Sequence, residues 1–179
     1  MSHNLVVTAM GVDRPGIVST LARLATECDC DIVDSRMAIF GNEFTLILML
    51  SGSWAAITKI ENNLPALSVE LELLTIMKRT STHTPQNYVS RVEVVFKGLD
   101  KRGTINKITS FLAQRSLDLA AVRSHSGLDE NQQPFQRIFL AINVPDMVDL
   151  DSLENTINEL AAELELTSTI KRMQSMTTL

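Results

Sequence analysis

Cysteine, histidine and aromatic residues are all scarce in this chain of 179 residues, with aromatics at only 4%. The two cysteines, Cys28 and Cys30, lie too close together to staple a fold, and no second pair or nearby histidine completes a zinc site. None of the histidines, His3, His83 and His125, stands beside a serine or cysteine in a nucleophile motif. The chain also lacks a phosphate loop and a dinucleotide fingerprint. These absences predict a protein with no catalytic residues, no metal site and no cofactor.

An excess of positive charge and long apolar runs are missing as well. The formal net charge is −5 and the sequence pI is about 5.2, so the electrostatic footprint of a protein that binds nucleic acid by itself is absent. No apolar run approaches the roughly 20 residues of a membrane span. Residues 1–4 do not begin a basic and then apolar signal peptide. We therefore expect a cytoplasmic protein that binds neither a membrane nor, autonomously, nucleic acid.

What the chain does contain is a repeated turn. The stretch Gly11–Val18 (GVDRPGIV) follows an apolar strand pattern and precedes a helical one. Its second copy is Gly98–Ile105 (GLDKRGTI), in the same context. The aspartate and the second glycine of each stretch recur at the same spacing of 87 positions (100 − 13 and 103 − 16). This recurrence indicates that one structural unit is present twice.

The pattern of the first half predicts the order strand, helix, strand, strand, helix, strand. A tight turn at Gly41-Asn42 makes the second and third strands antiparallel. Ser53 is a good N-cap for the second helix, which Pro65 is expected to end. The expected strands are Leu5–Met10, Ile32–Phe40, Glu43–Leu50 and Ser68–Lys78, and the first helix runs from Gly16 to about Cys28.

The same order recurs after a polar segment. We predict a first domain over 1–79, a linker over 80–87 and a second domain over 88–179. The expected fold class is α+β: two tandem ferredoxin-like βαββαβ domains, each an antiparallel sheet with its helices on one face. The second copy has a longer loop, 127–134, between its central strands.

The strand Phe44–Leu50 is apolar on both faces, although the helices of such a fold cover only one. The other face is therefore expected to meet either the second domain or another subunit, which leaves a homo-oligomer open. Trp54, in the first turn of the second predicted helix, is expected to pack on the sheet rather than to bind a ligand.

The repeated turn is the candidate ligand site. Gly16 has no Cβ, so a ligand can approach the main chain there, and the N-terminus of the following helix favours a carboxylate. Asp31 and Asp118 begin the strand after that helix in each copy, where a carboxylate could accept hydrogen bonds from an ammonium group. An amino acid carries both charges. The alternatives are that Pro15-Gly16 only starts a helix well and that the two acids are plain turn residues.

The stretch Asp13-Arg14-Pro15-Gly16-Ile17-Val18 within βαββαβ resembles the ACT domain, a small amino-acid-sensing module. Two further stretches of the first domain, 34–45 and 50–57, and the sequence of 77–80 resemble the glycine cleavage system transcriptional repressors. The second domain departs from the motif, since Lys101-Arg102-Gly103 stands where the family has Arg-Pro-Gly.

This resemblance implies a regulator without catalysis. It would act by protein–protein contact with a LysR-type activator of the glycine cleavage operon and respond to glycine. The ligand positions implied, in part across a domain interface, are Gly11, Asp13, Arg14, Pro15, Gly16, Ile17 and Asp31, with weaker counterparts at Asp100, Gly103 and Asp118. Such pockets usually carry Asn where this chain has Asp. The alternative functions are an amino-acid-sensing regulatory subunit of a biosynthetic enzyme and an enzyme in its own right.

Overall fold

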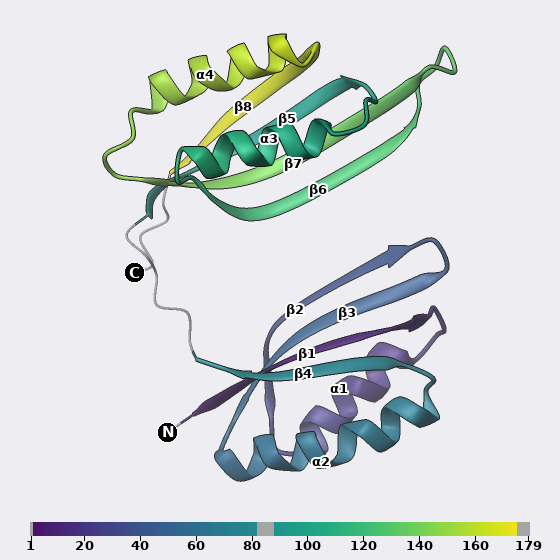
Figure 1. Cartoon of the computed structure of the whole chain (residues 1–179). Coiled ribbons are helices and arrows are strands. Elements are labelled where there is room, and N and C mark those ends of the chain that lie inside the picture. Colours follow the sequence, from purple (N-terminus) through teal and green to yellow (C-terminus); the bar gives the residue numbers. More distant parts are fainter. Residues whose placement is uncertain (1, 82–87, 175–179) are drawn as a thin grey trace. The chain divides into compact units, whose positions relative to one another are not determined.

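The chain divides into two compact units, Met1–Thr84 and Pro85–Leu179 (Figure 1). The computed structural model describes residues 2–81 and 88–174. The predicted linker, 80–87, and with it His83, lies outside the described residues from position 82 onward. Within the described ranges, no helix is long and apolar enough to cross a membrane.

The first unit has the predicted order βαββαβ. Its sheet has the strand order β2-β3-β1-β4, all neighbours are antiparallel, and both helices lie on one face of it (Figure 1). The elements are β1 (His3–Val12), α1 (Ile17–Glu27), β2 (Asp31–Phe40), β3 (Glu43–Gly52), α2 (Trp54–Glu70) and β4 (Leu74–Thr80).

The second unit repeats this topology with the strand order β6-β7-β5-β8 (Figure 1). Its elements are β5 (Tyr88–Leu99), α3 (Thr104–Gln114), β6 (Asp118–Leu128), β7 (Pro134–Pro145), α4 (Leu150–Glu163) and β8 (Leu166–Gln174). The predicted fold class, two ferredoxin-like α+β units with helices on one face, is confirmed.

Each sheet buries its alternate residues under its own helices. In β1, Leu5, Val7 and Ala9 are almost completely buried, because side chains along a strand alternate between the two faces. The facing stripe of α1 contributes Ile17 and Leu21 at helical spacing. The second unit forms a separate core of the same kind. Two independent apolar cores therefore hold the two units.

The prediction that Pro65 ends the second helix is wrong. Helix α2 continues to Glu70, and the residues expected to open a strand at Ser68 lie in its last turn and the turn that follows. Ser68 is buried and donates a hydrogen bond from Oγ to the carbonyl oxygen of Leu64, at 2.7 Å. Packing of this last turn against the core outweighs the missing N–H of the proline.

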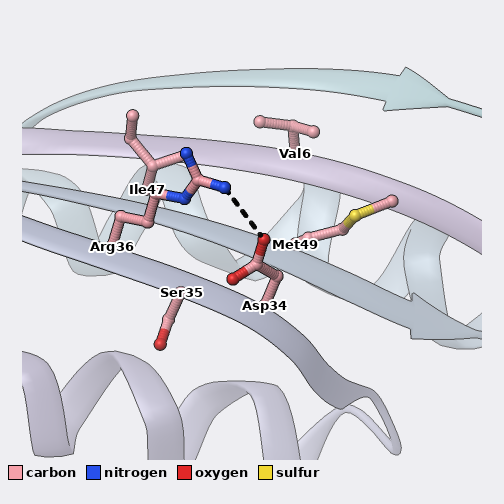
Figure 2. A pocket seen from close by; sticks show the side chains of 6 residues that line it. All are labelled: Val6, Asp34, Ser35, Arg36, Ile47 and Met49. Atoms are coloured by element: carbon pink, nitrogen blue, oxygen red, sulfur yellow. Dashed lines mark ion pairs between the residues drawn. The ribbon is translucent and has the colours of Figure 1, made fainter. Parts of the chain in front are cut away.

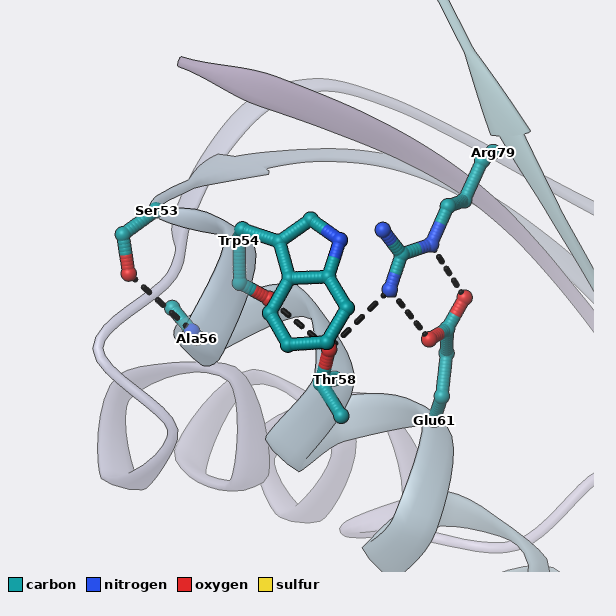
Figure 3. A network of polar contacts seen from close by, with 6 residues as sticks. All are labelled: Ser53, Trp54, Ala56, Thr58, Glu61 and Arg79. Carbon is teal, nitrogen blue, oxygen red and sulfur yellow. Dashed lines mark hydrogen bonds and ion pairs between the residues drawn. The ribbon is translucent and has the colours of Figure 1, made fainter. Parts of the chain in front are cut away.

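The expectation that Trp54 packs on the sheet is also wrong, since 59% of its surface is exposed. Figure 3 shows the indole beside Arg79 of β4, whose guanidinium carbon lies 5.3 Å from the ring centroid. Arg79 in turn donates two hydrogen bonds to the Glu61 carboxylate, at 2.9 and 2.7 Å, and a third to Thr58. This arginine clamp, Arg79 with Glu61 and Thr58, connects β4 to α2.

Candidate ligand-binding site

The repeated turn connects the first strand of each unit to its first helix, and its glycine has a left-handed backbone. Gly16 has a φ of 91° and Gly103 a φ of 89°. A Cβ at either position would meet no atom within 4 Å. Glycine is required here because of the backbone conformation and not because of crowding.

The helices that follow these turns begin without a side-chain cap. Neither α1 nor α3 has a side-chain hydrogen bond at its N-cap. The other two helices do: Ser53 accepts from the backbone N–H of Ala56 at 3.1 Å, and Asp149 accepts from Ser152 at 2.9 Å. The first N–H groups of α1 thus lack the side-chain acceptor that α2 and α4 have, and they can bind an anion. In α3 the N–H of Thr104 donates to the carbonyl oxygen of Lys101 at 3.3 Å, so only the N–H groups after it are in that position.

The backbone of the turn is anchored to the hairpin that the second and third strands of its unit form. The N–H of Asp13 donates to the carbonyl oxygen of Asn42 at 3.3 Å, and that of Asp100 donates to Pro134 at 3.2 Å. Asp13 is exposed and Asp100 half-buried. Asp13 lies three positions before Gly16 in this turn, and its exposed carboxylate can accept from an ammonium group.

Three other predicted site residues take part in holding the turn. Arg14 donates to the carbonyl oxygen of Leu71, and Ile17 packs in the core with 4% of its surface exposed. A Cβ on Gly11 would lie 2.7 Å from the Leu73 side chain, so this glycine allows β1 to approach the start of β4. Only main-chain atoms of Gly11 and Ile17 can face a ligand. Pro15 is exposed at the head of the turn.

The aspartates that open the second strand lie at the far end of the sheet from the turn in their own unit. Gly11 pairs with Phe44 of β3, whereas Asp31 pairs with Ser51, seven residues further along that strand. This separation is about 24 Å. Asp118 has the same place in the second unit and accepts a hydrogen bond from Asn143 at 3.2 Å. One small ligand cannot contact both ends of a single unit.

The second turn rests on a polar contact that the sequence analysis missed. Gln136 is buried and donates from Nε2 to the Leu99 carbonyl oxygen at 3.1 Å and to the Thr104 hydroxyl at 3.0 Å. By strand register Gln136 corresponds to the buried Phe44, since each pairs with the matching glycine of the first strand. A glutamine at an inward position of an apolar strand was the signal available in the sequence.

The two cysteines are buried thiols. Cys28 ends α1 and Cys30 precedes β2, with 2% and 6% of their surfaces exposed. Burial raises the pKa of both thiols above the ordinary value, which keeps them protonated and weakly nucleophilic. Both thiols pack in the apolar core of the first unit.

The first unit, which contains the first turn, matches a known domain family. Residues 3–78 match the family model of the ACT domain. The fold repeats the same unit after it. The class is therefore a tandem ACT-domain regulatory protein.

Two relatives and one solved structure identify the family, and a second solved structure shares the fold. The chain is 38% identical over 169 residues to the glycine cleavage system transcriptional repressor of Escherichia coli (strain K12) and to that of Shigella flexneri, covering 94% of this chain and 89% of each relative. A crystal structure of a protein assigned to the same repressors matches with a TM-score of 0.76 and 36% identity, over 98% of this chain and 99% of that one. A protein from Galdieria sulphuraria shares the fold at 17% identity, with a TM-score of 0.77 over 97% of this chain and 99% of that one. The chain belongs to the family of glycine cleavage system transcriptional repressors.

Proposed function

We propose that this chain is a non-catalytic co-regulator that represses the glycine cleavage operon. The observation that carries the proposal is the 38% identity to a repressor of that system over 94% of the chain. All four helices of the described residues belong to the two sheet units, and the chain has a net charge of −5. Both features favour action through a protein partner over direct reading of DNA. A regulator of transcription would act in the cytoplasm.

The proposed partner is a LysR-type activator, and the proposed effector is glycine. Glycine would change the affinity of the co-regulator for the activator, and a coupling of about 1–3 kcal/mol between the two binding events is enough for such a switch. Because coupling is reciprocal, the activator would change the affinity for glycine by the same factor.

We assign glycine to the first turn. Its carboxylate would accept from the N–H groups at the uncapped start of α1, and its ammonium group would donate to Asp13. Asp31 lies too far along the sheet to take part within the same unit, so its contribution would require a second unit or copy. The second turn, with Asp100 and Gly103, is the weaker site because Lys101-Arg102 replaces the Arg-Pro of the motif.

Thermal unfolding of the full chain with single amino acids tests the effector. Glycine at about 100 times its dissociation constant should stabilise the fold by roughly 2.7 kcal/mol. Asp13→Ala should abolish the shift, whereas Glu159→Ala, which removes one exposed negative charge from α4, should retain it. Loss of the shift in Asp31→Ala as well would mean that two sheet ends build the site. A shift with a different amino acid and none with glycine would overturn the assignment.

A separate measurement tests the repressor mechanism. In gel-shift experiments with operator DNA, the chain alone should cause no shift, and it should alter the complex formed by the activator. Glycine should reverse that alteration. Strong binding of operator DNA without the activator would refute action by protein contact, and so would co-purification with a large catalytic subunit in place of the activator.

A further inference from the structure

The sheet face not covered by helices has a hollow in each unit, and the two hollows share one pair of register positions. In the first unit the hollow has a volume of about 200 Å3, and in the second about 310 Å3. Strand register shows the correspondence, since Arg36 pairs with Ile47 in the first unit as Arg123 pairs with Phe139 in the second. The chain thus offers two versions of one surface for direct comparison.

The hollow of the first unit is electrically balanced. Figure 2 shows Asp34 and Arg36 turned toward each other, with 3.7 Å between the carboxylate and the guanidinium group. The remaining lining is mainly apolar and comes from Val6, Ile47 and Met49. This arrangement leaves no net charge for a charged ligand to pair with.

The lining of the second hollow contains no carboxylate and more cationic groups than that of the first. By register Ala121 takes the place of Asp34, so Arg123 has no carboxylate beside it and lies over the Phe139 ring, 4.5 Å from the centroid. His125 and Arg137 form the next pair along the strands, where the first unit has only alanine and threonine.

The basic groups of this hollow are not neutralised by the protein. Arg123, His125 and Arg137 line it together with Ser124 and Phe139, and none of these is acidic. Across residues 2–81 and 88–174, the side chains of His125 and Arg137 form neither a hydrogen bond nor an ion pair. Two exposed guanidinium groups concentrated on one sheet face of an acidic protein point to an anionic ligand.

We propose that this hollow binds a small organic anion with two or more carboxylate groups. Each guanidinium group can hold one carboxylate through paired N–H donors, and the imidazole can donate one more hydrogen bond. The volume lies at the lower end of the range of small-molecule sites, about 300–1,000 Å3. An amino acid is disfavoured because its ammonium group would lie among cations. The site is therefore distinct in place and in ligand class from the proposed glycine site.

Calorimetric titration of the full chain with citrate and with succinate, at constant ionic strength set by sodium chloride, tests this proposal. Both anions should bind, with citrate tighter. Arg123→Ala and Arg137→Thr, the latter copying Thr45 of the first unit, should each weaken binding about tenfold or more. Ala121→Asp, which restores the counterpart of Asp34, should weaken it similarly.

The matched control is Arg36→Ala, which removes the same charge at the same position of the other unit and should leave the affinity unchanged. Circular dichroism of every variant separates loss of binding from loss of folding. The proposal is overturned if neither anion binds above the chloride control. It is also overturned if Arg36→Ala and Arg123→Ala weaken binding equally, since the anion then recognises net charge and not this hollow.

Discussion

At the scale of single residues, the left-handed glycines of the two turns give the most direct prediction. Gly16→Ala should destabilise the first unit by about 1–2 kcal/mol, because an L side chain is strained at a positive φ even where space is open. Gly103→Ala should have the same effect on the second unit. Gly16→Asn should recover part of the loss, since asparagine tolerates this conformation better. Urea unfolding midpoints measure all three, and an unchanged midpoint for Gly16→Ala would contradict the argument.

The arginine clamp predicts a dependence of stability on pH. Hydrogen bonds from Arg79 lower the pKa of the Glu61 carboxyl, and those from Arg172 lower that of Glu154. A carboxyl with a lowered folded-state pKa stabilises the fold above its unfolded-state pKa, and this contribution is lost as the pH falls through the folded value. Glu61→Gln should therefore lower stability at pH 7.

The pH series itself is the measurement. Urea midpoints of Glu61→Gln and of the native chain should differ at pH 7 and converge between about pH 5 and pH 3. Glu43→Gln, at an exposed carboxylate of β3, is the control and should run parallel to the native chain. If the urea midpoints of Glu61→Gln and of the native chain differed by the same amount down to pH 3, the ionised Glu61 carboxylate would not be the source of the stabilisation.

Some residues of the candidate site could be predicted from the sequence and others could not. The glycine of the turn could be predicted, because a strand pattern, an Asp-x-x-Gly stretch and a helix pattern are all visible within a short stretch of sequence. The absence of a carboxylate partner for Arg123 could not be predicted, because it depends on which residues two strands place side by side. For Gln136 the inward position in an apolar strand was visible in the sequence, but its partner Thr104, 32 positions away in the chain, was not.

At the scale of elements, the second turn depends on the junction of β5, α3 and β7. Gln136→Leu should cost about 1–3 kcal/mol, because the buried Thr104 hydroxyl and the Leu99 carbonyl oxygen both lose their donor. Combining Gln136→Phe with Thr104→Ile, which copies Phe44 and Ile17 of the first unit, should cost less than the sum of the two single changes. Chemical denaturation of the four chains of this cycle measures the coupling, and strict additivity would rule out a shared network.

The boundary between α2 and β4 shows where a local sequence pattern fails to predict the structure. The residues from Val69 to Leu73 alternate between apolar and acidic, which is typical of a strand, and the chain forms a helix end and a turn there. Val69 is 79% exposed, whereas Leu73 is nearly buried. The order of the elements was predictable because the apolar periods are long, but the end of α2 was set by packing on the core, which no local window contains.

At the scale of the whole molecule, the repeat made the architecture predictable but not the assembly of the ligand site. The sequence pattern of each half specifies the order βαββαβ, and both halves adopt it. The same topology separates Asp13 from Asp31, because α1 returns the chain to the opposite end of the sheet before β2 begins. Proximity of the turn and the strand start in the sequence therefore says little about their distance in space.

Two separate cores predict two separable unfolding events. Ile57 is fully buried in the core of the first unit and Ile108 in that of the second. Ile57→Ala should lower the stability of the first unit by about 2–5 kcal/mol through the lost contacts and the cavity left behind. Hydrogen exchange followed by mass spectrometry should then show faster exchange in β1, β3 and β4, with β5, β7 and β8 unchanged. Ile108→Ala should give the reverse pattern. Equal acceleration of both sheets by either change would mean that the two units unfold as one cooperative body.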